Sequence, residues 1–535
     1  MSYTVVWFKR DLRVQDHAPL HHAAGRGPVL ALYVLEPSLW AQPDAALQHL
    51  NFLRETLRDL ALQLRPLGAT LQLAVGEVPE VLARLHASQP FARLMSHEET
   101  GNGHTFERDK AVARWCAQAG VQWQEWPQHG VVRRLPSRKV WTARWKALMH
   151  AAPWPTPQPG EIQGLTLPWG GERWPDAQPL GLSGPGLETP EPAQRQKGGR
   201  TLALQVLHDF LEQRSRSYRG GISSPLSAPT ACSRLSPHLA LGSLGMRELV
   251  QATTAHLQRL REQADPDSAW QRKGLSAFLS RLHWHCHFIQ KLEDEPALEF
   301  FNVHRGYDGL REDSFNPAHF DALTAGRTGW PMVDACVAQL RATGWINFRM
   351  RAMLVSVAAY ALWLHWRPVG LWLARQFLDY EPGIHWSQMQ MQSGTTGINT
   401  TRVYNPVKQA QDHDPDGHFV RRWLPALRRV PDAWLNQPWL MPPDVRARCG
   451  VAVRPDGDWV DSIPQPQVDL ASATREAKAR LYERRGQPEV REAKAAIVEK
   501  HGSRLIRPRA KRSAASSRAA AKSSPPTQQQ LDLGI

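Results

Sequence analysis

The sequence predicts a two-domain protein, with an α/β N-terminal parallel-sheet (Rossmann-like) domain followed by an all-α C-terminal domain. Short apolar runs alternate with amphipathic segments through the first 130 residues, an alternation typical of a parallel α/β sheet. A stretch rich in Pro and Gly follows, and helical periodicity dominates beyond residue 200,. We therefore expect an α/β domain over 1–130, an interdomain linker over 131–200, a helical domain over 201–500 and a basic disordered tail over 501–535.

The first domain should contain five strands. The apolar runs that predict them span 4–8, 28–35, 70–75, 92–97 and 121–126, and the helical patterns between them span 45–65, 78–87 and 105–119. No G-x-G-x-x-G follows the first strand, so the fingerprint of a dinucleotide-binding domain is absent and the domain need not bind NAD.

The second domain should be built from long helices. The strongest helical patterns span 201–218, 274–292, 332–345 and 349–366,. No internal repeat of solenoid period is present.

Bulk properties limit the class of protein. The 535 residues, 42% of them hydrophobic, suffice for two or three cores,. No apolar run reaches the roughly 20 residues of a membrane helix, and charges replace the apolar stretch of a signal peptide near the N-terminus. We expect a monomer in the cytoplasm, with no membrane partner. The five cysteines are scattered, which suggests reduced thiols rather than disulfides or a cysteine-bound metal,.

Charge and aromatic content point to an anionic partner. The formal net charge is +15, and nucleic acid is the commonest partner of so basic a protein. The tail carries part of this excess, but more than half lies outside it. The 22 tryptophans are mostly expected in cores, with a few available for redox chemistry or base stacking.

The segment 218–240 is a Ser-, Gly- and Pro-rich loop that leads into a helix. Ser236 is a candidate N-cap and Pro237 a candidate first helical residue,. Free amides and hydroxyls at such a helix end suit a phosphate group. A helix that is merely capped is the alternative interpretation.

A second segment, ATGWINFRMRAM at 342–353, places arginines inside a helical pattern. On a helical wheel Trp345, Phe348 and Arg351 share one stripe, and Arg349 points away from it,. A buried arginine needs a carboxylate or an anionic ligand, and Asp379 and Glu381 are candidate carboxylates. A structural ion pair without function is the alternative.

The segment HWHCHF places His283 and His287 four residues apart with Cys286 between them. A metal site would need a further ligand within reach, and we favour histidines that line a cavity. No metal site is predicted.

Five ordered motifs resemble those of the cryptochrome/photolyase family. They are VVWFKRDLRVQDH (5–17), SRLSPHLALG (233–242), TGWPMVDA (328–335), ATGWINFRMR (342–351) and YNPVKQAQDHDPDGHFVRRWLP (404–425). The resemblance covers nearly the whole chain. It implies an N-terminal α/β antenna domain, a long linker and a helical domain that binds FAD.

The resemblance also implies roles for particular residues. Those that match the positions holding the FAD diphosphate and ribityl chain are Tyr218, Ser233, Leu235 and Ser236. Arg351 and Asp379 match the ion pair beside the isoalloxazine ring, where a fixed cation would stabilise the anionic reduced ring. Other flavin contacts, or parts of the cavity wall, are matched by Trp284, Trp345 and Glu381.

Family members reduce the flavin through a relay of three tryptophans. Trp366 matches the middle position, whereas Met389 and Asp313 occupy the proximal and terminal positions. Trp386, one helical turn before Met389, is the nearest substitute.

The lesion-binding positions depart from the family pattern. Arg281 stands where DNA-repairing relatives carry a glutamate, and Phe348 aligns with the asparagine over flavin N5, with Asn347 adjacent. We expect FAD-dependent, light-driven repair of pyrimidine dimers in single- or double-stranded DNA. The alternative is a cryptochrome-like blue-light photoreceptor without repair activity.

Two further partners are implied by local sequence. Residues 97–109 stand where relatives contact a folate, so an antenna chromophore, folate or deazaflavin, is expected there. The final QLDLGI (530–535) resembles peptides that bind the replication sliding clamp, although a chance match in a low-complexity tail is the more ordinary explanation,.

Overall fold

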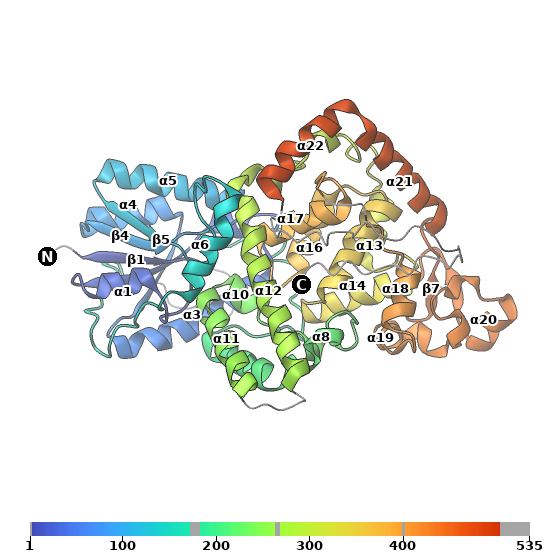
Figure 1. Ribbon diagram of the computed structural model, residues 1–535, viewed down its shortest axis with the longest axis horizontal. Helices are drawn as coiled ribbons and strands as arrows, with labels where there is room; N and C mark the ends of the chain where they lie inside the picture. The colour runs from blue at the N-terminus through green and yellow to red at the C-terminus, as the bar shows by residue number, and fades with distance from the viewer. Residues whose placement is uncertain (1–2, 172–181, 263–267, 399–401, 503–535) are drawn as a thin grey trace, which may run out of the picture.

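The computed structural model describes residues 3–171, 182–262, 268–398 and 402–502. Figure 1 shows a sheet-containing domain, coloured blue, beside a larger helical domain coloured green to red. The five expected strands are all present, as β1 (Thr4–Phe8), β2 (Val29–Leu35), β3 (Leu71–Val75), β4 (Arg93–His97) and β5 (Gln122–Trp126). They form a parallel sheet of order β3-β2-β1-β4-β5.

Helices cover both faces of this sheet (Figure 1). They are α1 (Ala18–Ala24), α2 (Pro37–Trp40), α3 (Leu47–Leu64), α4 (Val78–Ser88) and α5 (Gly103–Ala119). Because successive side chains of a strand point to opposite faces, Val6 and Phe8 join the core beneath α1 and α3, whereas Val5 and Trp7 join the core beneath α4 and α5. The predicted helices over 45–65, 78–87 and 105–119 are confirmed within two residues at each end.

The region beyond residue 200 is largely helical. Its helices are α7 (Arg200–Asp209), α8 (Ser215–Gly221), α9 (Ala228–Ala231), α10 (Ser236–Ala240), α11 (Met246–Glu262), α12 (Ser268–Asp294), α13 (Pro317–Ala325), α14 (Pro331–Thr343), α15 (Phe348–Ser356), α16 (Trp366–Gln376), α17 (Pro382–Ser393), α18 (Pro406–His413), α19 (His418–Trp423), α20 (Pro443–Cys449), α21 (Leu470–Gly486) and α22 (Pro488–His501). Shorter 3₁₀ or π turns are η1 (Arg65–Leu67), η2 (Phe210–Arg214), η3 (Pro296–Glu299), η4 (Arg305–Tyr307), η5 (Val357–Ala361), η6 (Pro425–Arg429), η7 (Asp432–Trp434) and η8 (Pro438–Leu440).

Two details of the helical prediction were wrong. The pattern over 349–366 is not one helix, because α15 ends in the π turn η5 and the chain leaves the helical path before α16 begins at Trp366. The domain is also not purely helical, since β6 (Ala452–Arg454) pairs with β7 (Ser462–Pro464). Both features depend on packing rather than on local periodicity.

The expected linker contains a helix. The segment α6 (Arg138–His150) buries Trp141, Trp145 and Met149 in a core that it shares with α7, α8, α11 and α12. The prediction missed it because the Pro- and Gly-rich composition begins only after α6 ends. The rest of the described linker contacts both domains. Arg195 forms an ion pair with Glu55 of the α/β domain, and the amide of Gln194 donates to the carbonyl of Ala342 in the helical domain.

The loop after β1 connects the two domains. Arg10 donates from Nε to the carbonyl of Ala240 at 2.7 Å and from Nη2 to the Glu381 carboxylate at 2.8 Å. It also reaches the carbonyl of Tyr380 at 3.3 Å. One side chain of the α/β domain therefore holds both the end of α10 and the residue that precedes α17.

Backbone contacts extend this junction. The amide of Leu12 donates to the carbonyl of Leu241 at 3.1 Å, and Arg13 donates to the carbonyl of Gly242 at 2.9 Å. Gly242 has a φ of +64°. A Cβ there would lie 2.1 Å from the carbonyl oxygen of Arg10, so the close approach of the two domains requires glycine.

Within the described residues no helix is long and apolar enough to cross a membrane. The sequence QLDLGI lies outside these residues, as does nearly all of the basic tail, and its match to clamp-binding peptides stays a prediction.

We expect Gly242→Ala to weaken the junction between the domains. The left-handed backbone alone costs a non-glycine residue roughly 1–2 kcal/mol, and the contact with the Arg10 carbonyl adds to that cost. Urea unfolding should show a clear loss of stability. Gly120→Ala is the control, because Gly120 has a φ of +68° but no atom within 4 Å of its Cβ position. Equal losses in the two variants would contradict the tight fit at Gly242.

Candidate FAD site

Arg351 and Asp379 form an ion pair with one hydrogen bond in the helical domain. Nη2 of Arg351 donates to Oδ2 of Asp379 at 3.0 Å, and Nη1 lies 3.0 Å from Oδ1. Nε of Arg351 donates to the carbonyl of Ile346, and the guanidinium lies 4.2 Å from the ring centroid of Phe377. These contacts leave the guanidinium little freedom, so the cation has a fixed position.

The environment keeps Asp379 ionised. Burial by itself would raise the pKa of this carboxyl, but the charge and hydrogen bond of Arg351, a hydrogen bond from Ser236 and the charge of Arg234 together lower it. Asp379 therefore carries its negative charge at neutral pH, and it holds Arg351 and the start of α10 together.

The position of Ser236 in α10 differs from the predicted one. Ser236 is the first residue of α10 rather than its N-cap, and no side chain caps this helix. Its hydroxyl instead contributes to lowering the pKa of Asp379. Pro237 is the second residue of α10, one position later than predicted. The sequence supports either role for a serine before Pro, and the nearby carboxylate decides between them.

The other predicted residues of this loop are fixed by a hydrogen bond or by burial. Arg214 donates to the carbonyl of Ser233 at 3.2 Å, Leu235 is buried, and Tyr218 lies buried on α8. Burial raises the pKa of the Tyr218 hydroxyl to about 12, although its hydrogen bond with Arg281 acts in the opposite direction. Of the four predicted loop residues, Tyr218 lies near Arg281 and Ser236 near Asp379.

Trp345 does not share a helical stripe with Arg351, because α15 begins only at Phe348. The prediction extended the helix too far: Asn347 occupies the N-cap position. Trp345 is buried, and the guanidinium of Arg234 lies 3.8 Å from its ring centroid. The side chain of Phe348 is 44% exposed, so it can line a cavity mouth rather than a core.

The site carries more positive than negative charge. Four arginines, at 214, 234, 281 and 351, lie close enough to Cys232 to oppose the rise in its thiol pKa that burial causes. Arg214 pairs with Asp209 and Arg351 with Asp379. Within the described part of the chain, Arg234 and Arg281 form no ion pair. Burial lowers the pKa of Arg234 to about 10, so an anionic ligand would relieve both groups.

Several buried polar atoms in this region also have no protein partner among the described residues. They are Nε of Arg281, Nε1 of Trp284 and Oδ1 of Asn347. A buried polar atom without a partner costs about 1–3 kcal/mol, so such atoms indicate a missing ligand. The unpaired Arg234 suits a diphosphate, and the free donor of Trp284 and acceptor of Asn347 suit a polar ring system. The residues present therefore fit FAD.

Glu381 has a different place from that expected of a flavin contact. It is buried and paired with Arg10 of the α/β domain at 2.8 Å. Burial raises its pKa, and Arg10 opposes that rise. Its observed interactions are those of the domain junction.

Trp366 and Trp386 lie next to each other in the core. Their ring centroids are 5.9 Å apart, with an interplanar angle of 70°. Both are fully buried, and Nε1 of Trp366 donates to Oδ1 of Asn302 at 2.8 Å. The suggestion that Trp386 substitutes at the proximal position gains a geometric basis, because the two indoles are close enough for electron exchange.

The histidines of the HWHCHF segment pack into the surrounding structure. The ring of His283 contacts Trp141 and Trp145, and Nη2 of Arg138 lies 2.6 Å from Nδ1 of His287. Burial lowers the pKa of His283 to about 4. Among the described residues, these side chains do not gather around a common point that could hold an ion.

A cavity of about 140 Å³ lies between the carboxyl ends of β1 and β2 and the helical domain. The segment 97–109 contributes Glu99, Gly101, Asn102, Thr105 and Arg108 to its wall. Trp7, Tyr33 and Tyr380 add aromatic surface. The expected antenna segment therefore borders a cavity, in the place where open α/β sheets bind their ligands.

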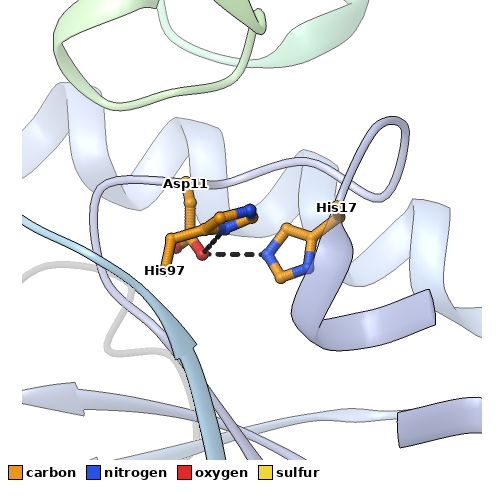
Figure 2. A group of neighbouring side chains, drawn as sticks. All are labelled: Asp11, His17 and His97. Atoms are coloured by element: carbon orange, nitrogen blue, oxygen red, sulfur yellow. Dashed lines mark hydrogen bonds and ion pairs between the residues drawn. The ribbon is translucent and has the colours of Figure 1, made fainter. Parts of the chain in front are cut away.

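A buried cluster lies at the same edge of the sheet and consists of Asp11, His17 and His97 (Figure 2). These residues come from the loop after β1, the start of α1 and the end of β4, respectively. Oδ2 of Asp11 accepts from Nε2 of His17 at 2.9 Å and from Nδ1 of His97 at 2.8 Å. Nδ1 of His17 accepts from the amide of Leu20, so Nε2 must carry the proton. A metal would need that nitrogen bare, and the cluster is instead a hydrogen-bonded anchor.

The pKa shifts of the three residues agree with these proton positions. Burial lowers the pKa of His17, and it lowers the pKa of His97 to about 3. Both imidazoles are therefore neutral at neutral pH and donate one N–H each. Burial acts to raise the pKa of Asp11, but these donors hold it well below the usual range.

Two residues of the site, Arg234 and Asn347, have contacts that the sequence did not predict. Arg234 contacts Trp345 and influences Asp379, and its φ of +60° is unusual outside glycine. Asn347 donates from Nδ2 to the carbonyls of Ile222 and Ser223, both at 2.9 Å. Arg234 lies inside a recognised motif, so its charge was a usable signal. The contact of Asn347 joins segments 124 residues apart and has no local signature.

Comparisons with known proteins agree with this geometry. A family model described as DNA photolyase matches residues 4–158, and one described as FAD binding domain of DNA photolyase matches residues 278–483. The chain is 30% identical over 517 residues to cryptochrome DASH of Gloeobacter violaceus, covering 91% of this chain and 99% of that protein. It is 29% identical over 471 residues to a deoxyribodipyrimidine photo-lyase of Vibrio cholerae, covering 82% and 93%.

Solved structures show the same fold. A bacterial class III photolyase from Agrobacterium tumefaciens matches with a TM-score of 0.73 at 25% identity, covering 91% of this chain and 98% of that one. A Synechocystis cryptochrome matches with the same TM-score at 23% identity, over 90% of this chain and 99% of that one. The chain belongs to the cryptochrome/photolyase family, whose members include both photolyases and cryptochromes.

We expect Asp379→Asn to destabilise the site. Removing one partner of a buried ion pair costs about 3–5 kcal/mol, and the 23% exposure of the Arg351 side chain should reduce that figure. Purified Asp379→Asn should retain much less FAD, measured as the ratio of flavin to protein absorbance. Exposed Asp432, which pairs with Arg421, provides the control Asp432→Asn. Full FAD content in Asp379→Asn would contradict the proposed role.

We expect Trp366→Phe to slow the photoreduction of bound FAD strongly, because it removes one indole of the adjacent pair. Trp372→Phe is the matched control, since Trp372 is buried on the same helix but has no ring contact with Trp386. The measurement is the rate of flavin absorbance change under blue light. An unchanged rate in Trp366→Phe would place the relay among other residues.

Proposed function

We propose that this protein repairs pyrimidine dimers in DNA in a light-driven reaction that requires FAD. The family membership and the fit of the site to FAD support the cofactor. The observation that carries the repair proposal is Arg281, which lies near the Tyr218 hydroxyl and has its Nε buried without a partner among the described residues. A free donor of this kind, beside the FAD site, is available to a substrate.

FAD, when bound, would supply light absorption and the transferable electron. The chain's own contribution begins with the Arg351–Asp379 pair, which would hold a fixed cation beside the ring. Ser236 and Asp379 would keep the start of α10 in place, and Arg234 offers a charge for the diphosphate. Each of these groups is held by contacts within the protein, and fixed groups of this kind are the condition for effective electrostatic stabilisation.

Arg281 would act on the lesion itself. A cyclobutane dimer that has accepted an electron carries negative charge on its carbonyl oxygens. A guanidinium can donate two parallel hydrogen bonds to such oxygens, whereas an ionised carboxylate has no donor. Arg281 would therefore replace the glutamate of DNA-repairing relatives by a different chemistry, and it would stabilise the charge while the ring bonds break.

DNA would bind through its phosphates. The net charge of +15 supports a polyanionic partner,. A lesion must leave the base stack to reach a buried site, and a dimer is easier to unstack than an intact pair of bases. Phe348, with 44% of its surface exposed, could pack against the displaced bases.

An antenna chromophore, folate or deazaflavin, would occupy the cavity at the sheet edge. The 140 Å³ cavity is smaller than the roughly 300–1,000 Å³ of typical ligand sites. Only part of such a chromophore would insert, and the rest would lie outside. The segment 97–109 would contact the inserted ring.

A cryptochrome-like photoreceptor without repair is the second candidate. It is favoured by the two positions that depart from the lesion-binding pattern, Arg281 and Phe348, and by the relative named cryptochrome DASH. Such a receptor would need the FAD site and the tryptophan pair but no contact with a lesion.

The cytoplasmic location, the monomeric state and the sliding-clamp contact stay predictions.

The deciding experiment irradiates the reduced protein with dimer-containing single- and double-stranded oligonucleotides and measures dimer loss. Dimer loss with the parent supports repair, and its absence on both substrates favours the receptor. Arg281→Ala should lower the repair yield by roughly tenfold or more, with FAD content and photoreduction unchanged.

Two variants sharpen this test. Arg281→Lys keeps the charge but loses the two-pronged donor, so we expect an intermediate yield. Arg272→Ala removes a cation from the same helix, nine residues earlier, and should repair like the parent. If the parent repairs dimers and Arg281→Ala repairs them equally well, Arg281 has no part in the reaction.

A further inference from the structure

A cavity of about 470 Å³ lies where the last two helices, α21 and α22, meet at the edge of the helical domain (Figure 1). Its volume is within the roughly 300–1,000 Å³ of typical ligand sites. None of the residues assigned above to FAD, DNA or the antenna chromophore lines it. The lining comes from η4 and the residue before it, the loop after α17, α21 and α22, and consists of His304, Tyr307, Gly397, Tyr482, Arg485, Gly486, Val490, Arg491 and Lys494.

Packing and one histidine fix the walls of this cavity. Tyr307 of η4, Leu481 of α21 and Val490 of α22 share a hydrophobic core. Nε2 of His304 donates to the carbonyl of Val490 at 2.8 Å, and Nδ1 accepts from the amide of Gly306 at 3.2 Å. The second contact needs an Nδ1 without a proton, so Nε2 carries it. Because both nitrogens are occupied, His304 forms part of the wall and joins η4 to α22.

The lining carries three cations and no carboxylate. The cations are Arg485, Arg491 and Lys494. Within the described part of the chain none of the three forms an ion pair, whereas Arg480 and Lys500 on the same two helices each pair with a glutamate. Like charges around one cavity disfavour one another. An anion bound among them would therefore be stabilised by all three.

The amino end of α22 adds to this positive potential. The helix begins at Pro488 and has no side-chain cap. Its first turn contributes Val490 and Arg491 to the lining. The amides of Glu489 and Val490 have no backbone acceptor among the described residues, as is usual at a helix start. Free amides and the helix dipole favour negatively charged groups, and phosphates in particular.

The cavity wall also contains a hydroxyl without a partner. Tyr307 is buried, with 4% of the residue exposed, and it lines the cavity. Its hydroxyl makes no hydrogen bond with another described residue. Burial raises the pKa of this hydroxyl, and the charge of Arg485 opposes the rise. The hydroxyl therefore lies toward Arg485, keeps its proton at neutral pH and is free to donate to a ligand.

Aromatic surface distinguishes this cavity from a simple anion site. Tyr482 of α21 lines it and is 60% exposed. A nucleic-acid base can stack on such a ring, which contributes about 1–3 kcal/mol per base in single-strand binding proteins. Inorganic phosphate alone would leave this ring and most of the cavity without contacts. The lining thus suits a ligand that has both a phosphate and a planar ring.

We propose that this cavity binds a nucleoside phosphate, whose phosphate groups contact the three cations and the amino end of α22 and whose base packs against Tyr482. Unpaired cations and free amides are the groups that bind phosphate oxygens. A free nucleotide and the phosphorylated end of a DNA strand share this chemistry. The inference goes beyond the proposed repair function and does not depend on it.

The test uses the full-length, FAD-containing protein and measures binding by isothermal titration. The probes are ADP, adenosine and inorganic phosphate. We expect one equivalent of ADP to bind, and adenosine and phosphate to bind at least roughly tenfold more weakly, because each keeps only part of the contacts. Added NaCl should weaken ADP binding, since salt screens exposed charges. FAD absorbance should stay constant, which shows that ADP does not replace the flavin cofactor.

Variants locate the nucleotide. Arg485→Ala and Arg491→Ala should each weaken ADP binding by roughly tenfold, because each removes a charged donor. Tyr307→Phe removes only the free hydroxyl and should weaken binding by a smaller factor. Arg484→Ala is the control, because it removes the same charge from the neighbouring position of α21, which does not line the cavity. Circular dichroism and FAD content check that each variant is folded.

A competition experiment identifies the source of the nucleotide. The competitor is an undamaged, 5′-phosphorylated single-stranded oligonucleotide. If it displaces ADP from the parent and binds Arg485→Ala more weakly, the cavity holds the end of a strand. If ADP stays bound, the ligand is a free nucleotide. Both results support a site for nucleoside phosphates.

Three outcomes would overturn the proposal. The first is a parent protein that binds no ADP. The second is ADP binding that is equal in the parent, Arg485→Ala and Arg491→Ala, which would place the nucleotide elsewhere. The third is inorganic phosphate that binds as tightly as ADP, which would show that the base makes no contact.

Discussion

The loop after β1 is the constraint on which the two-domain arrangement depends. Asp11 accepts two imidazole N–H groups inside the α/β domain, and this anchors a loop whose neighbouring residue, Arg10, reaches into the helical domain. Arg10 holds the end of α10 and Glu381 together. Because Ser236 begins α10 and Asp379 lies two residues before Glu381, the same contacts restrain both sides of the FAD site.

The electrostatics of the molecule differ between its two domains. The FAD site gathers four arginines around few carboxylates, whereas the edge of the sheet gathers carboxylates around Arg108. Buried charge without a partner is unfavourable, so the first region suits an anionic cofactor, and the carboxylates of the second are held by their own cation.

Replacing a carboxylate by Arg281 in such a site is consistent with its surroundings. The guanidinium lies near the Tyr218 hydroxyl and among other cations. Like charges disfavour one another, so an anion that binds beside Arg281 would stabilise it.

The sequence by itself determined the class of the fold and most of its elements. Strand periodicity and helix periodicity are local, so all five strands and the principal helices of the α/β domain followed from it. The Arg351–Asp379 pair also followed, because a buried arginine requires a carboxylate and the family motifs supplied one. Local pattern gave the wrong result where packing decides whether a helix forms and where it ends. It missed α6, extended α15 back to Trp345 and merged α15 with α16.

Only the tertiary structure decided which partner each polar group has. Ser236 looked like a helix cap, but it is the first residue of a helix that no side chain caps. Glu381 matches a flavin contact or the cavity wall by resemblance, and the structure adds its pair with Arg10, 371 residues away in the chain. Hydrogen bonds between distant segments set these differences, and no local pattern in the sequence records them.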